Sequence, residues 1–97
     1  MSIIDIIPLG ADNAITRSEL TAKSGMTDRR MRDAIQKARA NGELILNSQD
    51  GRGYFRATAD DLDEIQRQYK QDTARAMAIL KRRKAMRDIL KAAGRAV

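Results

Sequence analysis

The segment from residue 16 to residue 57 limits the possible folds of this chain more than any other part of the sequence. Two stretches with helical patterns, residues 16–24 and 27–40, are separated by only two residues. The first of these two residues is Gly25, which permits the left-handed backbone conformation that a tight turn between helices needs. The spacing therefore predicts two consecutive helices joined by a short turn.

Capping residues mark where both helices begin. Thr16 is followed three residues later by Glu19, the signature of a capping box, whereas Thr27 is followed by Arg30 and offers only the cap itself. A shorter helix is expected near the N-terminus, where Ser2 precedes two pairs of isoleucines. These signals predict three helices within the first 40 residues.

A β-hairpin is expected directly after the second long helix. Asn41-Gly42 stops the helix, and the apolar segment Leu44-Ile45-Leu46 follows. The polar segment from Ser48 to Gly53, which includes Gln49, predicts a turn, and residues 54–57 predict the return strand. We also expect Ala14-Ile15 to add one short rung to this sheet.

Together these elements predict a mainly α protein with a small β-hairpin, a winged helix-turn-helix over residues 1–57. Residues 58–97 follow as one long C-terminal helix, because no glycine or proline interrupts the chain between Gly53 and Gly94. Residues 58–61 are expected to open this helix with an acidic first turn.

The composition argues against an enzyme. The chain has 97 residues without a single cysteine or histidine, which excludes disulfides and catalysis by Ser-His or Cys-His pairs. Zinc ligation would need carboxylates alone, and no glycine-rich phosphate loop is present. We therefore expect no catalytic residues, no metal site and no cofactor.

The N-terminal segment Met1–Pro8 is apolar but has no basic leader, and Asp5 and Pro8 interrupt it. It does not fit a signal peptide, and no stretch approaches the length of a membrane span. We therefore expect a cytoplasmic protein of a bacterial or phage-infected bacterial cell, with no membrane partner.

The net charge of +6 is unevenly distributed. Residues 1–58 carry nine basic and seven acidic side chains, residues 59–72 carry two and five, and residues 73–97 carry eight and one. Most of the positive charge therefore lies in the C-terminal segment rather than in the helix-turn-helix.

The helix over residues 27–40 has one apolar side and one polar side with long basic side chains. In a helix-turn-helix, the polar side of the second helix is the one that enters the DNA major groove. Arginine pairs with guanine, glutamine with adenine, and an acid accepts from cytosine. The predicted DNA-binding residues of this helix are Thr27, Asp28, Arg29, Arg30, Arg32, Asp33, Gln36 and Lys37. The alternative is a solvated face in a winged helix that binds a protein.

Arg52 lies between Gly51 and Gly53 at the expected tip of the hairpin. An arginine at this position can enter the minor groove or contact phosphate, so Arg52 completes the predicted DNA-binding set. The alternative is an ordinary soluble turn.

The C-terminal helix carries an apolar stripe with heptad spacing, interrupted by Asp72 and Arg83. This stripe predicts a homodimer or a higher homo-oligomer. The expected oligomerisation residues are Leu62, Ile65, Tyr69, Ala76, Ile79, Leu80, Met86 and Leu90.

The charges along this helix favour antiparallel pairing. An acidic patch at its start, residues 60–64, would then lie near the basic end of a second copy, although a single stable helix also prefers acidic residues first and basic residues last. The densest basic cluster, residues 81–84, encircles the helix. It fits either contact with nucleic acid or pairing with an acidic helix.

The motifs around residues 14–20, 25–32 and 53–55 resemble those of small winged-helix proteins encoded by phages and prophages of Gram-positive bacteria. More distantly, the chain is similar to the DNA-binding domain of biotin-operon repressors, which also has a Gly-Tyr pair after the wing. The resemblance implies a transcriptional regulator that binds double-stranded DNA through its recognition helix and the wing. The residues that it assigns to these two parts are Thr27, Asp28, Arg29, Arg32, Asp33 and Gln36 for the helix and Arg52 for the wing. Ala38 stands where such helices usually have a larger leucine, which favours support from oligomerisation.

Two functions are thus expected from the sequence. The first is a DNA-binding regulator of phage or prophage type that dimerises through its C-terminal helix. The second is an adaptor that binds proteins through the winged-helix scaffold and a coiled-coil tail.

Overall fold

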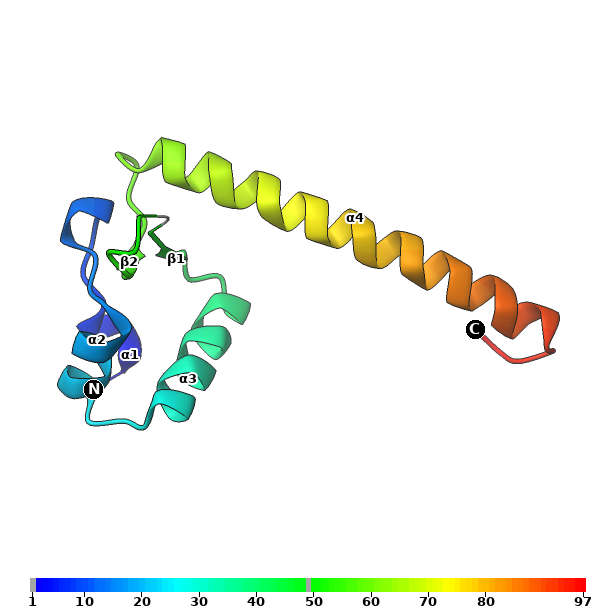
Figure 1. The fold of residues 1–97 in the computed structure, drawn as a ribbon, viewed down its shortest axis with the longest axis horizontal. Helices are drawn as coiled ribbons and strands as arrows, with labels where there is room; N and C mark the ends of the chain where they lie inside the picture. Colours follow the sequence, from blue (N-terminus) through cyan, green and yellow to red (C-terminus); the bar gives the residue numbers. More distant parts are fainter. Residues whose placement is uncertain (1, 49) are drawn as a thin grey trace. The chain divides into compact units, whose positions relative to one another are not determined.

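The computed structural model describes residues 2–48 and 50–97; Gln49, expected in the hairpin turn, lies outside the described residues. The fold confirms the predicted class, a helical chain with one antiparallel hairpin (Figure 1). By backbone contacts, the chain divides into the units Met1–Gln66 and Arg67–Val97. The elements in chain order are α1 (Ile3–Ile6), the 3-10 turn η1 (Ala11–Asn13), α2 (Arg17–Ser24), α3 (Asp28–Ala40), β1 (Ile45–Asn47), β2 (Tyr54–Arg56) and α4 (Leu62–Ala92).

Side-chain caps start the helices where the sequence predicts them. The Thr16 hydroxyl accepts from the Glu19 N–H at 3.1 Å, and the Thr27 hydroxyl accepts from the Arg30 N–H at 3.2 Å. Between the two helices Gly25 has φ 68°, in the left-handed region where glycine is favoured. The caps and the glycine thus define the helix-turn-helix.

Helix α1 is a single turn that ends before Pro8. Ser2 caps it, and Asp5 completes a capping box with the Ser2 backbone. Ile7 already has an extended backbone, as expected for a residue that precedes proline. Pro8 therefore belongs to the turn after the helix.

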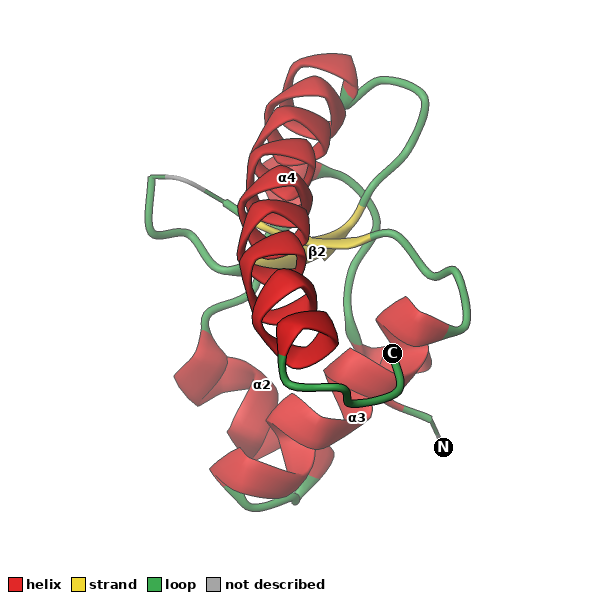
Figure 2. Ribbon diagram, turned by 90° about the vertical axis from the view of Figure 1, so that its right-hand side faces the viewer, coloured by secondary structure: helices red, strands yellow, loops and turns green. Residues whose placement is uncertain are grey.

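Strand β2 is the central strand of a small sheet. It pairs with β1 on one side, where Phe55 faces Leu46. On its other side Tyr54 exchanges two backbone hydrogen bonds with Ile15, of 2.7 and 2.8 Å. The expected rung at Ile15 is therefore confirmed. Figure 2 shows the strands in yellow.

The apolar segment predicted as strand 44–46 forms its ladder one residue later, over Ile45–Asn47. Ile45 packs into the core formed by the helices, whereas Leu46 packs with Phe55 in a second cluster on the other face of the sheet. Two adjacent residues are buried because both faces of the hairpin are covered. Leu44 remains 55% exposed.

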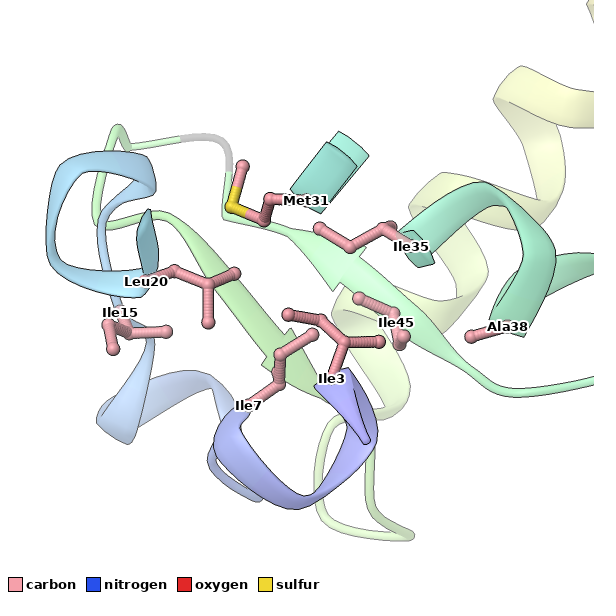
Figure 3. Close-up of a cluster of buried hydrophobic side chains, with 8 residues drawn as sticks. All are labelled: Ile3, Ile7, Ile15, Leu20, Met31, Ile35, Ala38 and Ile45. Atoms are coloured by element: carbon pink, nitrogen blue, oxygen red, sulfur yellow. The ribbon is translucent and has the colours of Figure 1, made fainter. Parts of the chain in front are cut away.

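The main core fills the space between the first three helices and β1. Its side chains point toward one another in Figure 3, and Leu20 and Met31 join the two helices of the helix-turn-helix. Each buried side chain of this size contributes about 1.5–3 kcal/mol relative to an exposed one. The eight core residues are Ile3, Ile7, Ile15, Leu20, Met31, Ile35, Ala38 and Ile45.

Helix α4 begins at Leu62 and not at residues 58–61, where the sequence predicts its first turn. Those residues form a turn because the Asp61 carboxylate accepts from the N–H and the hydroxyl of Thr58, a side-chain alternative to helical hydrogen bonding. The helix ends at Ala92. Beyond it, the Gly94 N–H donates to the Lys91 carbonyl and the Arg95 N–H donates to the Leu90 carbonyl. This pair of bonds is a Schellman motif.

Candidate nucleic-acid interface

Helix α3 presents two sides of opposite character. Met31, Ile35 and Ala38 are buried against the core, as the helical spacing predicts. On the other side, the exposed residues of the predicted site are Arg29, Arg30, Arg32, Asp33, Gln36 and Lys37. At 100° per residue, Arg29, Asp33 and Gln36 lie nearly opposite Met31, so they form the centre of the exposed face. Arg30 and Lys37 lie along one edge.

The other edge of this face is held by a chain of ion pairs. The Asp28 carboxylate, half-buried at the start of α3, lies 3.1 Å from Nε of Arg32 and 3.2 Å from Nε of Arg17. Arg17 is the first residue of α2. Asp28 therefore links the two helices of the helix-turn-helix, which gives it a role that the sequence pattern does not reveal.

At the tip of the wing, Arg52 contacts acidic residues of its own chain. Its Nε lies 2.6 Å from the Asp50 carboxylate, and its Nη1 lies 3.9 Å from that of Asp12. A hydrogen bond from the Ser48 hydroxyl, together with those from Arg52, lowers the pKa of Asp50 below its ordinary value. The wing thus contains an arginine whose charge is partly balanced within the fold.

The two glycines that flank Arg52 have different roles. Gly51 has φ 84°, and a Cβ there would meet no atom within 4 Å. Gly53 has φ 108°, and a Cβ would lie 2.0 Å from the Ile15 carbonyl oxygen. Gly53 is therefore needed for the close approach of β2 to Ile15 inside the protein.

Two further arginines are used to hold the fold together. The Arg39 guanidinium donates to the Ile45 carbonyl at 2.8 Å and joins the end of α3 to β1. The Arg56 guanidinium donates to the Ile7 carbonyl at 2.7 Å. Within the described part of the chain, Arg29, Arg30 and Lys37 form no ion pair. These three cations therefore carry the positive charge of the α3 face that no acidic side chain balances.

Asp61 is buried, although its neighbours in the sequence form an acidic patch at the start of the C-terminal helix. One carboxylate oxygen accepts from the Ala11 N–H at 3.1 Å, and the other accepts from the Thr58 N–H at 2.8 Å. These hydrogen bonds lower its pKa, the bond from Thr58 having the largest effect. Asp61 therefore fastens the start of α4 to η1, and the pattern Thr58-x-x-Asp61 is the only sequence signal of this role.

The predicted oligomerisation residues lie in different environments. Ile65 is half-buried and packs against the cluster that contains Phe55 of its own chain. From Tyr69 to Val97 every residue is exposed, and Tyr69 itself is 72% exposed. The exposed members of the predicted set are Leu62, Tyr69, Ala76, Ile79, Leu80, Met86 and Leu90.

Comparison with known proteins gives no further information about this site. No protein-family model, curated protein or solved structure matches the chain. Across residues 2–48 and 50–97, none of the helices has both the length and the apolar character needed to cross a bilayer. The function is therefore inferred from the residues of the site.

Proposed function

We propose that this protein binds double-stranded DNA through the exposed face of α3. The observation that carries the proposal is the position of this face on the second helix of a helix-turn-helix. Its opposite side is fixed in the core by Met31 and Ile35, while Arg29, Asp33 and Gln36 are exposed on a rigid element. Winged-helix proteins place this helix in the major groove.

The side chains at the centre of the face match the chemistry of base edges. Arg29 offers two donors to guanine, Gln36 offers a donor and an acceptor to adenine, and Asp33 accepts from the amino group of cytosine. Arg30 and Lys37 along the edge supply contacts to phosphate, which position the protein without selecting a sequence. Arg52 extends these contacts to the neighbouring backbone.

The proposal includes self-association through α4, so that two copies contact two half-sites. This helix leaves seven of the eight predicted oligomerisation residues exposed, and a small core is commonly supplemented by oligomerisation. By the resemblance described above, the biological role is that of a transcriptional regulator of phage or prophage type in the bacterial cytoplasm. The proposal has no catalytic step and no cofactor.

Selection of bound sites from a random duplex library tests this function directly. We expect a sequence to be enriched, and we expect Arg29→Ala to weaken binding to that site by about 1–3 kcal/mol and to relax the preference at one base pair. Arg67→Ala, which removes an exposed arginine outside the α3 face, is the matched control. Equal affinities of wild type and Arg29→Ala for the selected site would refute the assignment.

An adaptor that binds another protein is the second candidate. It is favoured by the ion pairs of Arg52 with Asp50 and Asp12, which reduce the positive potential of the wing. The dependence of affinity on salt separates the two functions. The logarithm of the association constant for DNA falls as the logarithm of the salt concentration rises, and each phosphate contact makes this slope steeper by about 0.9. Failure to enrich any duplex, with capture of a protein partner that is insensitive to salt, would favour the adaptor.

A further inference from the structure

The apolar stripe of α4 is interrupted at two positions by charged residues of opposite sign. In heptad terms, Tyr69, Ala76 and Leu90 occupy a positions, while Ile79 and Met86 occupy d positions. Asp72 occupies a d position, and Arg83 occupies an a position. Both are exposed, and the apolar side chains of α4 from Tyr69 onward are exposed as well.

The two interruptions are placed symmetrically along the helix. Asp72 and Arg83 lie the same number of residues before and after the point between Met77 and Ala78. The same point lies midway between Tyr69 and Met86. Ala76 and Ile79 are also equally distant from it.

We infer that two copies of this chain pair antiparallel through α4, centred on the point between Met77 and Ala78, with Asp72 of each copy facing Arg83 of the other. In a twofold-symmetric interface, a residue i that faces j implies that j faces i. This register therefore forms the Asp72–Arg83 pair twice. It also places Tyr69 against Met86, a favourable contact of sulfur with an aromatic ring.

Every layer of this register joins an a position to a d position, so the apolar layers stay in contact across the interface. A parallel pair in register would instead place Asp72 beside Asp72 and Arg83 beside Arg83 within the apolar seam, and like charges at such positions are destabilising. An antiparallel pair shifted by one heptad would leave both charges facing apolar residues. The two charged residues thus select both the direction and the register.

The hydrogen bonds within the chain are compatible with this pair. The Asp72 carboxylate accepts from the Gln68 amide at 2.9 Å through one oxygen, and a carboxylate has further acceptor sites for a guanidinium. Ile65 lies near the end of the seam and is partly covered by its own chain, so the layers from Tyr69 to Met86 form the centre of the interface. The inference rests on the self-association proposed above and does not depend on DNA binding.

Sedimentation equilibrium without DNA tests the charged pair. We expect Asp72→Arg and Arg83→Asp each to raise the dimer dissociation constant by about 10-fold or more, because each change places two like-charged pairs in the seam. The double variant restores both pairs with their signs exchanged and should return to within a few-fold of wild type. Asp88→Arg and Lys81→Asp make the same charge changes on the opposite side of the helix and should have little effect.

Disulfide trapping tests the direction, since the natural chain contains no cysteine. In a glutathione redox buffer, a mixture of the Tyr69→Cys and Met86→Cys chains should form a crosslinked heterodimer, while neither variant alone should crosslink efficiently. Efficient crosslinking of Tyr69→Cys with itself would indicate parallel helices and overturn the inference.

The outcomes distinguish the levels of the proposal. A monomer mass that does not change with concentration would refute self-association and the inference with it, but not DNA binding by α3. If the effects of Asp72→Arg and Arg83→Asp on the dimer dissociation constant simply add in the double variant, the chain self-associates but the proposed register is wrong. Circular dichroism of each variant confirms that α4 remains helical in the comparison.

Discussion

The Asp28 carboxylate lies 3.1 Å from Nε of Arg32, one turn further along α3, and its second oxygen pairs with Arg17 of α2. One acid therefore pairs with an arginine on each of the two helices of the helix-turn-helix. This arrangement balances positive charge at one edge of the α3 face and leaves Arg29 and Gln36 for the proposed contacts with bases. For the proposed binding to DNA, it favours selection of a sequence over strong non-specific binding.

Asp28→Asn should strengthen binding to non-specific duplex. The change removes a negative charge and releases two arginines, so we expect affinity to rise about 3- to 10-fold and the salt slope to steepen by about 1–2. Stability should change by less than about 1 kcal/mol, because ion pairs that remain open to solvent contribute little. Fluorescence anisotropy across a salt series measures both quantities. Asp63→Asn makes the same charge change on α4, and an equal effect there would contradict the explanation.

Gly53→Ala should destabilise the protein, because the new Cβ would overlap the Ile15 carbonyl at a positive φ. We expect a loss of roughly 3 kcal/mol, combining backbone strain with the steric overlap. Gly51→Ala is the matched control in the same turn, where the space is open, and should cost only about 1 kcal/mol. Urea denaturation measures both changes. Equal losses would show that the contact with Ile15 has no special effect.

Asp61→Asn should lower stability near neutral pH, since an amide cannot replace both carboxylate acceptors of the N–H groups of Ala11 and Thr58. Because the pKa of Asp61 is lowered in the fold, its contribution is present above the unfolded value, about 4. It is lost as the pH falls through the lower folded value. The difference in Tm between wild type and variant should therefore shrink below about pH 4. Asp60→Asn, at an exposed neighbour, should show no such convergence.

Met31→Ala should destabilise the winged helix by about 2–5 kcal/mol, because the Met31 side chain is fully buried in the main core, which also contains Leu20 of α2. Met77→Ala removes the same atoms from a side chain that is 52% exposed. It should change stability by less than about 0.5 kcal/mol when measured at a concentration where the chain is monomeric. Chemical denaturation followed by circular dichroism compares the two, and similar losses would contradict the assigned core.

The elements that depend on local signals were predictable from the sequence. Thr16 and Thr27 cap α2 and α3 as their patterns indicate, and Gly25 forms the turn between them. The apolar and polar sides of α3 also follow from the spacing of Met31 and Ile35. Such features are set by residues three or four positions apart, whose interactions a sequence displays directly.

The roles that join distant segments were not predictable in the same way. Asp28 has the spacing of a residue that faces DNA, but Arg17 of the preceding helix comes within reach only after α2 and α3 have packed together. In the sequence, Gly53 is indistinguishable from a glycine that only makes the turn flexible. The need for glycine at this position is visible only in the fold, where Ile15 leaves no space for a Cβ. A charge or a glycine has many possible partners along a sequence, and folding selects one of them.

The sequence by itself determined the order of the elements, the caps of the helices and the polar side of α3, because these depend on local periodicity and hydrogen bonding. Only the tertiary structure decided which charged side chains are paired within the fold and which are not. It engaged Asp28, Arg39, Arg52 and Asp61 in contacts with segments that pack beside them. The physical reason is that ion pairs and buried hydrogen bonds act over a few ångströms, so their partners are fixed by packing and not by distance along the chain.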